Sequence, residues 1–445
     1  MTNAQRNWFG QPRGLTILFL TEMWEQFSYF GMRALLVYYM TEQLLIGQEK
    51  SSLIYGAYTS TAFFTPIIGG VISDRWLGKR RAVILGGSIM AAGHFMMTFV
   101  PLFYVALATI AIGNGLFLPS LPSQINDLYA PDDPRRTWAY NVYYVGINIG
   151  AFLAPLVCGT LGEIYGWHWG FGAAGVGMLA GVVIYAWGGK YLPEQGRRSM
   201  LPHAAERESV QAASASGTGF RHGRSTVLLL LGIGLSVTVF RAAYEQIGNT
   251  VALWADVGVD RSTALFEIPM TWFQSLNPLV VFLGTPLLLA YWKRRAASRR
   301  ESSSMQKMAS GALIVAGAYL LLALAASLAG GGRASWLWLT AYFVVFTVGE
   351  LHILPVGLGV FARLAPPTLG ATTIASWFLA IFTGSLTAGF VGTLWSRMSH
   401  AQFFAILAGI ATLSALLLIL LDPATRRIEG EAAATVPVVG GEPVA

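Results

Sequence analysis

Long apolar stretches, separated by short polar ones, follow one another along almost the whole 445-residue chain. A helix needs about 20 mainly apolar residues to cross the roughly 30 Å hydrocarbon core of a bilayer. Stretches of this kind predict twelve transmembrane helices, and the longest are typical of tilted helices. We therefore expect an all-α membrane protein. The predicted helices cover residues 15–45, 52–73, 82–99, 101–128, 137–162, 169–192, 226–255, 268–292, 308–330, 335–362, 369–396 and 400–421.

Composition supports a membrane protein and argues against several other classes. Charged residues make up 11% of the chain, less than half of the about 25% that is typical of soluble domains. The net charge is +7, but the basic residues form short clusters and no continuous face, which argues against nucleic-acid binding. The single cysteine, Cys158, excludes an intramolecular disulfide framework and a cysteine-based zinc site. We expect neither a metal nor another cofactor.

The distribution of Lys and Arg predicts the orientation of the helices, because basic residues are retained on the cytoplasmic side of a membrane. With a cytoplasmic N-terminus, most of the 29 Lys and Arg residues fall in cytoplasmic segments. Both termini are therefore expected in the cytoplasm. The compact loops suggest a bacterial inner membrane, in which we expect a monomer.

One long polar segment, residues 193–225, divides the predicted helices into two sets of equal number. Its Ala, Ser, Gly and Thr residues are typical of a flexible linker. The parts on either side, residues 1–192 and 226–422, predict two six-helix bundles. This layout is typical of transporters built from two parallel repeats, whose substrate site lies between the repeats near mid-membrane. Residues 423–445 are expected to form a disordered cytoplasmic tail.

The first predicted helix carries four polar residues on one face. Glu22, Glu25, Tyr29 and Arg33 are three or four residues apart, a spacing that places side chains on one stripe of a helix. An ionisable residue inside a membrane span costs roughly 2.5–3.5 kcal/mol on insertion scales. The stripe is therefore expected to point into a water-filled cavity or the bundle interior. The alternative is a purely structural network of Glu25 and Arg33 that holds helices together.

Charged residues also interrupt two predicted helices of the second half. Arg241 and Glu245 are spaced as an i, i+4 pair. Glu350 lies shortly before Pro355, which is expected to loosen its helix. Since Glu350 has no cation nearby in the sequence, it is a candidate for binding a substrate cation or a proton. The sequence contains no recognisable nucleophile triad, phosphate-binding loop or metal site, so we do not expect an enzyme.

One loop motif resembles a known superfamily of membrane transporters. The segment from Gly70 to Arg81 is similar to the loop signature of the major facilitator superfamily. The resemblance implies that its glycines permit close helix approach. It also implies an acid–base cluster that breaks and reforms as the two halves rock against each other. The residues of this gating loop would be Gly70, Asp74, Arg75, Gly78 and Arg80.

Nearly the whole chain also resembles the proton-dependent oligopeptide transporter (peptide transporter) family of that superfamily, as a divergent member. The segment from Glu22 to Gly31 is similar to the ExxER[FY]xYYG motif of this family. Residues 113–123 parallel its GxGxxKPxxS pattern, and residues 143–152 match its YxxINxGxF pattern. Shorter similarities lie at Tyr244 to Gln246, Trp272 to Pro278, Gly349 to Gly357 and Trp377 to Leu379. The implied fold has twelve transmembrane helices in two six-helix bundles.

The resemblance also implies roles for individual residues. Arg33 would bind the carboxylate of a peptide and Glu350 its amino group, which suits the opposite charges of a zwitterion. Glu22, Glu25 and Glu245 would take part in proton coupling. The pocket would be completed by Tyr29, Tyr58, Asn148 and Trp377. Taken alone, Tyr58, Asn148 and Trp377 are more simply interpreted as packing or interface residues.

Two positions depart from the family pattern. Gln26 stands where the first-helix arginine is expected, and Leu118 where the family has a lysine. Without these cations the carboxylates lose charge partners. Proton coupling then uses a different shuttle, or it is lost, or the substrate supplies the positive charge. Our hypothesis is that Arg241 replaces a lost cation, either by pairing with Glu245 or by reaching the cavity.

The combined interpretation is a secondary active transporter that couples protons to the symport of di- or tripeptides, or peptide-like substrates, by alternating access. The alternative is a divergent transporter of the same fold that moves another amphipathic or peptide-derived metabolite. Such a transporter could work with or without proton coupling. A receptor that binds without transporting is disfavoured, because the sequence shows no large soluble signalling domain.

Overall fold

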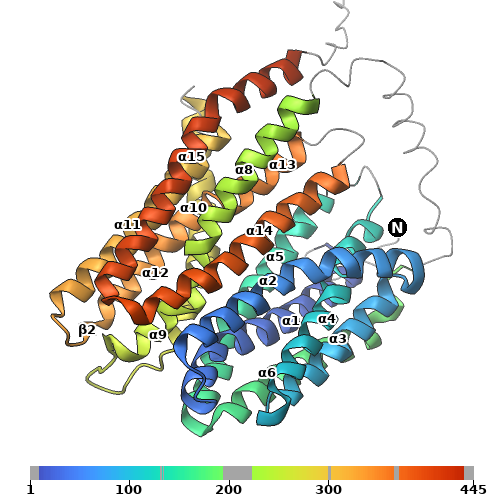
Figure 1. Ribbon diagram of the computed structural model, residues 1–445. Coiled ribbons are helices and arrows are strands. Elements are labelled where there is room, and N and C mark those ends of the chain that lie inside the picture. Colours follow the sequence, from blue (N-terminus) through green and yellow to red (C-terminus); the bar gives the residue numbers. More distant parts are fainter. Residues whose placement is uncertain are drawn as a thin grey trace, which may run out of the picture.

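The computed structural model is an almost entirely helical protein (Figure 1). It describes residues 10–130, 133, 135–193, 223–298, 302–364 and 370–434. The first half of the chain forms α1 (Arg13–Tyr38), α2 (Gln48–Ile72), α3 (Lys79–Met96), α4 (Phe103–Ser120), α5 (Arg135–Ala154) and α6 (Trp167–Gly188). The second half forms α8 (Gly223–Tyr244), α9 (Thr250–Val257), α10 (Trp272–Ala297), α11 (Ser304–Leu328), α12 (Trp336–Leu351), α13 (Leu354–Leu364), α14 (Gly370–Gly392) and α15 (His400–Ala434). Two short strands of the second half, β1 (Val259–Asp260) and β2 (Ala334–Ser335), pair in parallel.

Within the described part of the chain, nine helical segments are long and apolar enough to cross a membrane. They start with the segment from Val100 to Asp127 and end with the segment from His400 to Arg427. The helices α1, α2 and α3 are not among them, and α1 carries two glutamates and an arginine along its middle. For these three helices, a position across the membrane stays a prediction.

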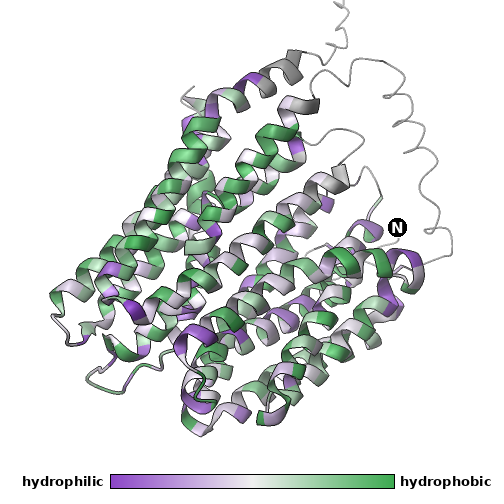
Figure 2. Cartoon of the chain, viewed as in Figure 1, coloured by the Kyte–Doolittle hydropathy of each residue, from purple (hydrophilic) through white to green (hydrophobic). Residues whose placement is uncertain are grey.

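The helices form two bundles, one from each half of the chain (Figure 1). Where the bundles meet, α2 lies against α14, and α5 lies against α10. Each half has its own buried apolar core, although Val37 and Tyr38 of α1 reach into the core of the second bundle. Hydrophobic residues are spread over both bundles, and several of the most hydrophilic stretches lie near helix ends and loops (Figure 2).

The two ends of the bundles are distinguished here by the segments that they contain. The starts of α1 and α8 and the ends of α6 and α15 lie at one end, which we call the terminal end. The connections that follow α1, α9 and α14 lie at the opposite end, which we call the loop end.

Two helices of the second half are broken next to their charged residues. After α8 the chain forms a 3₁₀ turn, η11 (Glu245–Gly248), before α9 begins. A second break separates α12 from α13 directly before Pro355, so the expected loosening of this helix is confirmed. Proline cannot donate a backbone N–H to the preceding turn, which accounts for the break. Glu245 and Glu350 consequently lie at the ends of regular helices.

The expectation of a disordered tail from residue 423 is wrong for its first part. The helix α15 continues to Ala434. After Pro423 the sequence is rich in Ala, Glu and Arg, which are good helix formers, so local propensity outweighs the polar composition. Residues 435–445 lie outside the described residues, as does most of the linker expected at 193–225, since the structure describes nothing between residues 193 and 223.

Glycine allows α2 and α4 to touch backbone to backbone. A Cβ atom on Gly69 would lie 2.0 Å from the carbonyl oxygen of Gly115. A Cβ atom on the neighbouring Gly70 would lie 3.6 Å from Pro119, which is an ordinary contact. In this conformation the close approach is therefore made by Gly69, and Gly70 makes none. Gly78 serves a turn, where its φ of 76° favours glycine.

This geometry predicts opposite effects for two adjacent substitutions. Alanine is a better helix former than glycine, so Gly70→Ala is expected to leave the apparent melting temperature in detergent unchanged or slightly higher. Gly69→Ala introduces a clash with backbone and is expected to lower it, with a cost of about 1–3 kcal/mol. Equal melting temperatures for the two purified variants would show that α2 and α4 do not approach closely at Gly69.

Candidate functional site

A cavity of about 690 Å³ lies between the two bundles. Its wall is largely apolar, and the charged residues that line it are Glu25 and Arg33 from α1 and Arg241 from α8. The cavity extends toward the terminal end, because Asn141 near the start of α5 and Trp292 near the end of α10 also line it. Other lining residues come from both halves, among them Gln26, Tyr29, Phe63, Leu118, Tyr144, Tyr244, Leu354 and Trp377.

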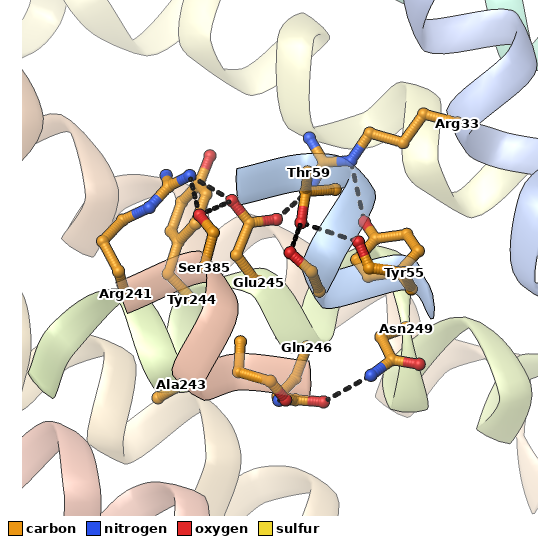
Figure 3. Close-up of polar contacts among 12 residues, drawn as sticks. Arg33, Tyr55, Thr59, Arg241, Ala243, Tyr244, Glu245, Gln246, Asn249 and Ser385 are labelled. Atoms are coloured by element: carbon orange, nitrogen blue, oxygen red, sulfur yellow. Dashed lines mark hydrogen bonds and ion pairs between the residues drawn. The ribbon is translucent and has the colours of Figure 1, made fainter. Parts of the chain in front are cut away.

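Glu245 binds two arginines, one from each half of the chain (Figure 3). Its Oε2 accepts a hydrogen bond from Arg33 Nη2 at 2.7 Å, which forms an ion pair between α1 and η11. Its Oε1 pairs with Arg241 Nη2 and accepts a hydrogen bond from Ser385 Oγ at 3.2 Å. Arg33 Nε in turn donates to the Tyr55 hydroxyl at 2.8 Å. The pairing of Arg241 with Glu245 expected from their spacing is thus confirmed.

These charges are almost fully enclosed by protein. The side chain of Glu245 is 1% exposed, that of Arg241 5% and that of Arg33 12%. The Arg241 guanidinium also lies over the rings of Phe63 and Tyr244, at 5.1 and 4.5 Å from their centroids, where cation–π attraction stabilises it. Arg241 therefore both pairs with Glu245 and reaches the cavity wall, the two arrangements expected of a replacement cation.

Glu350 lies next to the cavity and is held by two neutral donors. Tyr244 donates its hydroxyl proton to Glu350 Oε1 at 2.8 Å, and Asn277 Nδ2 donates to Oε2 at 2.6 Å. Since Tyr244 lines the cavity and contacts Arg241, it connects Glu350 to the arginine network. Arg33 and Glu350 thus belong to opposite halves of the chain, as expected, but Arg33 is paired with Glu245 in this conformation.

A second cluster of acids lies on α1, nearer to the terminal end. Gln26 Nε2 donates to Glu22 Oε1 at 3.1 Å and to Glu25 Oε2 at 2.7 Å. Both glutamates are buried. The stripe expected on the first helix is therefore real, but the structure divides it, with Glu22 and Glu25 around Gln26 and Arg33 bound to Glu245. The proposed Glu25–Arg33 network is not formed by the described contacts.

The expected pocket residues divide into two groups. Tyr29 and Trp377 line the cavity, and Trp377 packs edge-to-face against Phe361 at a centroid distance of 5.1 Å. Tyr58 and Asn148 are buried and do not line it in the described structure. Asn148 donates to the carbonyl oxygen of Tyr144, which does face the cavity, so the predicted direct contacts of Tyr58 and Asn148 are not seen in this conformation.

The expected gating loop lies at the terminal end of α2 and α3. Asp74 and Arg75 belong to the π-helical turn η3 (Ser73–Leu77) and are exposed, and neither forms an ion pair with any residue described. Arg80 lies against the backbone of Gly189 at the end of α6. An ion pair in this region joins Lys79 to Asp127 at 2.8 Å. Among the described contacts, Asp74 and Arg75 do not assemble the expected acid–base cluster in this conformation.

The loop end is closed by a side chain of one half that caps a helix of the other. Glu163, in the π-helical turn η8 (Leu161–Tyr165), accepts hydrogen bonds from the backbone N–H groups of Met270 and Thr271 at 2.8 and 2.9 Å. These groups precede α10 and would otherwise lack a partner. A carboxylate at a helix N-terminus is also stabilised by the helix dipole. Separation of the halves at this end must break these bonds.

Further contacts between the halves gather at the same end. The Tyr38 hydroxyl donates to the carbonyl oxygen of Ala252 at 2.7 Å. Glu49 and Arg397 form an exposed ion pair at 2.9 Å. The backbones of α2 and α14 also touch there, since a Cβ atom on Gly56 would lie 2.6 Å from Gly389 Cα. The cavity is therefore shut off at the loop end and extends toward the terminal end.

Several residues of the network carry no assigned role from the sequence. Tyr55 and Ser385 bind the charged residues through neutral hydroxyl groups. A neutral hydroxyl in a membrane span is not costly in the way that a charged residue is, so these two residues do not stand out in the sequence. Asn277 and Tyr244, which bind Glu350, lie in segments that are similar to the family. This similarity is the only feature of the sequence that points to them. Glu163 lies at a helix end, where a carboxylate is common and does not by itself indicate a function.

Two helical bundles that enclose a cavity between them, closed at one end, define a membrane transporter with the major facilitator superfamily fold. A family model described as the POT family matches residues 80–208 and 201–407 of the chain. The chain therefore belongs to the POT family, as its motifs predicted. It is an integral membrane transporter and not an enzyme.

Related proteins and solved structures are similar over nearly the whole chain. A di-/tripeptide transporter of Lactococcus lactis subsp. cremoris is 30% identical over 97% of this chain and 99% of its own length. The peptide transporter YePEPT of Yersinia enterocolitica is 30% identical over 88% and 89% of the two chains. A crystal structure of peptide transporter POT in complex with sulfate is 30% identical, with a TM-score of 0.86 over 95% of this chain and 97% of that one.

The ion-pair network predicts that two loop-end glutamates differ in their effect on stability. Glu245→Ala leaves Arg33 and Arg241 buried without their anion, and breaking a buried pair in this way costs about 3–5 kcal/mol. The apparent melting temperature in detergent is therefore expected to fall markedly.

Glu49→Ala is the matched control, because Glu49 also pairs with an arginine of the other half but is exposed to solvent. We expect little or no change in its melting temperature. If Glu245→Ala and Glu49→Ala were equally stable, the buried network would not hold the halves together.

Proposed function

We propose that this protein is a proton-coupled symporter that imports di- and tripeptides by alternating access. The observation that carries this proposal is the cavity between the halves, with Arg33 on its wall from one half and the Tyr244–Glu350 pair beside it from the other. Its volume of about 690 Å³ falls within the roughly 300–1,000 Å³ of small-molecule sites. Relatives named as di-/tripeptide transporters support this substrate class.

A zwitterionic peptide suits the charges of this cavity. Arg33 presents a guanidinium that can bind a carboxylate through two parallel hydrogen bonds. Glu350 provides the opposite charge for the amino group of the peptide. The termini of an extended peptide lie roughly 3.3–3.6 Å apart per residue, so a short peptide is the natural cargo. Tyr29 and Trp377 would pack against its side chains, and Tyr58 and Asn148 would join the pocket only after a rearrangement.

Proton coupling follows from the position of Glu245. As a carboxylate it binds Arg33 of the first half and Arg241 of the second, and it thereby holds the loop end closed. When Glu245 is protonated, the two guanidinium groups lose their shared anion and repel each other, which favours opening at this end. Arg33 is then released to bind the carboxylate of an incoming peptide. Protonation of Glu245 and peptide binding therefore favour the same step.

Arg241 would take over part of the role of the cation that is missing at Leu118. Leu118 lines the cavity from α4, so a lysine at this position would have reached the same space. Arg241 reaches it from α8 and is held in place by Glu245 and the Tyr244 ring. The positive charge near the substrate carboxylate is thereby supplied by the second half of the chain.

We place the terminal end in the cytoplasm and the loop end outside, in a bacterial inner membrane, with the protein as a monomer. This orientation puts most Lys and Arg residues on the cytoplasmic side. The structure then corresponds to an inward-facing conformation. The gating loop with Gly70, Asp74, Arg75, Gly78 and Arg80 would rearrange when the cytoplasmic side closes.

A second candidate function is transport of another amphipathic or peptide-derived metabolite without proton coupling. It is favoured by the absence of a cation at Gln26 and Leu118, which leaves Glu22 and Glu25 bound to a neutral amide. A substrate that carries its own positive charge would then complete the site.

Uptake of labelled dialanine into proteoliposomes tests the proposal. An inward proton gradient is expected to stimulate uptake, and an uncoupler to abolish the stimulation. Glu350→Gln is expected to lower uptake at least about tenfold, equivalent to roughly 1.4 kcal/mol of lost binding. Arg241→Gln is expected to lower it as well, whereas Glu49→Gln serves as a control with normal uptake. Dialanine uptake that is absent with every proton gradient would favour the second candidate.

A separate outcome concerns Arg241 alone. If Arg241→Gln transported dialanine as well as the parent while Glu245→Gln did not, Arg241 would not replace the missing cation.

A further inference from the structure

A second, smaller cavity of about 200 Å³ lies between α10 and α11, near the terminal end. Two cations line it, Arg295 from the last turn of α10 and Lys307 from the beginning of α11. The other lining residues are Tyr291, Trp292, Ser302, Ser310, Ile314 and His352. Positive charges, hydroxyl groups and aromatic rings therefore face one space that is separate from the charged network around Glu245.

Aromatic side chains orient both cations at this cavity. Arg295 Nη1 donates a hydrogen bond to the Tyr291 hydroxyl at 3.0 Å. The ammonium group of Lys307 lies over the Trp292 ring, 5.1 Å from its centroid. Cation–π attraction holds a positive charge in place but does not neutralise it. The wall of the cavity thus carries two formal positive charges at defined positions.

The start of α11 adds to the attraction for an anion. Lys307 lies close to the N-terminus of this helix, where the helix dipole is also positive. An anion in the cavity is therefore favoured by the side chain and by the helix. Asp422 also lies near the start of α11, but it binds Ser303 and Arg426 and does not line the cavity.

The surface that continues from this cavity toward the loop end is apolar. Leu287 lies one turn before Tyr291 on α10 and is 73% exposed. On α11, Ile314 follows Ser310 by one turn, and a Cβ atom on Gly317 would meet nothing within 4 Å. In a bilayer, an exposed apolar surface of this kind is covered by acyl chains. A charged cavity next to an apolar surface suits a molecule with an anionic head group and hydrocarbon tails.

We propose that this cavity binds the phosphate of an anionic phospholipid, with Arg295 and Lys307 at the phosphate oxygens and the acyl chains along Leu287 and Ile314. Basic pockets between transmembrane helices bind anionic lipid head groups in this way. Ser310 adds a hydroxyl that can donate to a phosphate oxygen. A zwitterionic lipid fits less well, because its head group brings a cation close to the two that are already present. This binding site does not depend on the proposed function.

Trp292 connects the lipid site to the transport cavity, because it lines both. Its ring lies beneath the Lys307 ammonium and packs edge-to-face against His352, at a centroid distance of 5.4 Å. A phosphate that fixes Lys307 therefore also stabilises the position of Trp292 in the wall of the transport cavity. This consequence for transport rests on the proposed function.

Native mass spectrometry of the delipidated protein, with phosphatidylglycerol or phosphatidylcholine added, tests the site. We expect the parent to bind one phosphatidylglycerol more tightly than phosphatidylcholine. Lys307→Gln and Arg295→Gln are each expected to weaken this binding at least about tenfold, the scale of a lost hydrogen bond to a charged group. Lys307→Arg keeps the charge and is expected to retain it. Arg294→Gln is the matched control, because Arg294 is exposed on the same turn of α10 and does not line the cavity.

Four results would overturn the proposal. Phosphatidylglycerol could bind no more tightly than phosphatidylcholine, or Arg294→Gln could weaken binding as much as Lys307→Gln, which would indicate attraction to the basic segment as a whole. Inorganic phosphate alone could bind as tightly as the lipid, which would assign the site to a free anion. Binding of phosphatidylglycerol only to Glu301→Gln would assign the two cations to the carboxylate of Glu301, which lies between them in the sequence.

The effect on transport is measured separately, as dialanine uptake into phosphatidylcholine vesicles with and without phosphatidylglycerol. We expect phosphatidylglycerol to stimulate uptake by the parent and by Arg294→Gln, and to have no effect on Lys307→Gln. Uptake by the parent that does not respond to phosphatidylglycerol would contradict the connection through Trp292. Tight binding of phosphatidylglycerol by a protein that takes up no dialanine in any lipid would refute the proposed function and support the lipid site.

Discussion

The ion pair between Arg33 and Glu245 is the interaction on which the arrangement of this transporter depends. It joins two residues from different halves of the chain, and it lies between the cavity and the closed loop end. Because both partners are buried, the charges cannot be separated without new partners. A peptide carboxylate for Arg33 and a proton for Glu245 are the two partners that meet this requirement. The link between cargo and proton thus follows from the cost of an unpaired charge in a low-dielectric interior.

The charges of the cavity are distributed unevenly along its length. Arg33 and Arg241 lie near the closed end around one anion, and Glu22 and Glu25 lie further toward the terminal end around a neutral amide. The two positions that depart from the family motifs, Gln26 and Leu118, both bear on this distribution. The α1 carboxylates consequently lie beside a neutral amide, whereas Glu245 is bound by two arginines.

Much of the helical framework and part of the site could be predicted from the sequence. Apolar stretches locate the helices because a membrane span must satisfy its own backbone, and the i, i+4 pair of Arg241 and Glu245 needs only local geometry. The pairing of Arg33 with Glu245 could not be predicted, because it joins residues far apart in the chain. Tyr55 and Ser385 are neutral, so nothing in the sequence distinguishes them from other residues of their helices. Gly69 and Gly70 are adjacent and differ only in which face of α2 they occupy.

The most direct measurement of the central interaction is the distance between the two halves at the loop end. Spin labels at Lys50→Cys and Ser399→Cys would report it by pulsed electron resonance, since both sites are exposed and the only native cysteine, Cys158, is buried. With Glu245 intact and charged, we predict a single short distance. Glu245→Gln, which removes the charge and keeps the shape, is predicted to add a population at longer distance. A distribution unchanged by Glu245→Gln would contradict the claim that this ion pair keeps the loop end closed.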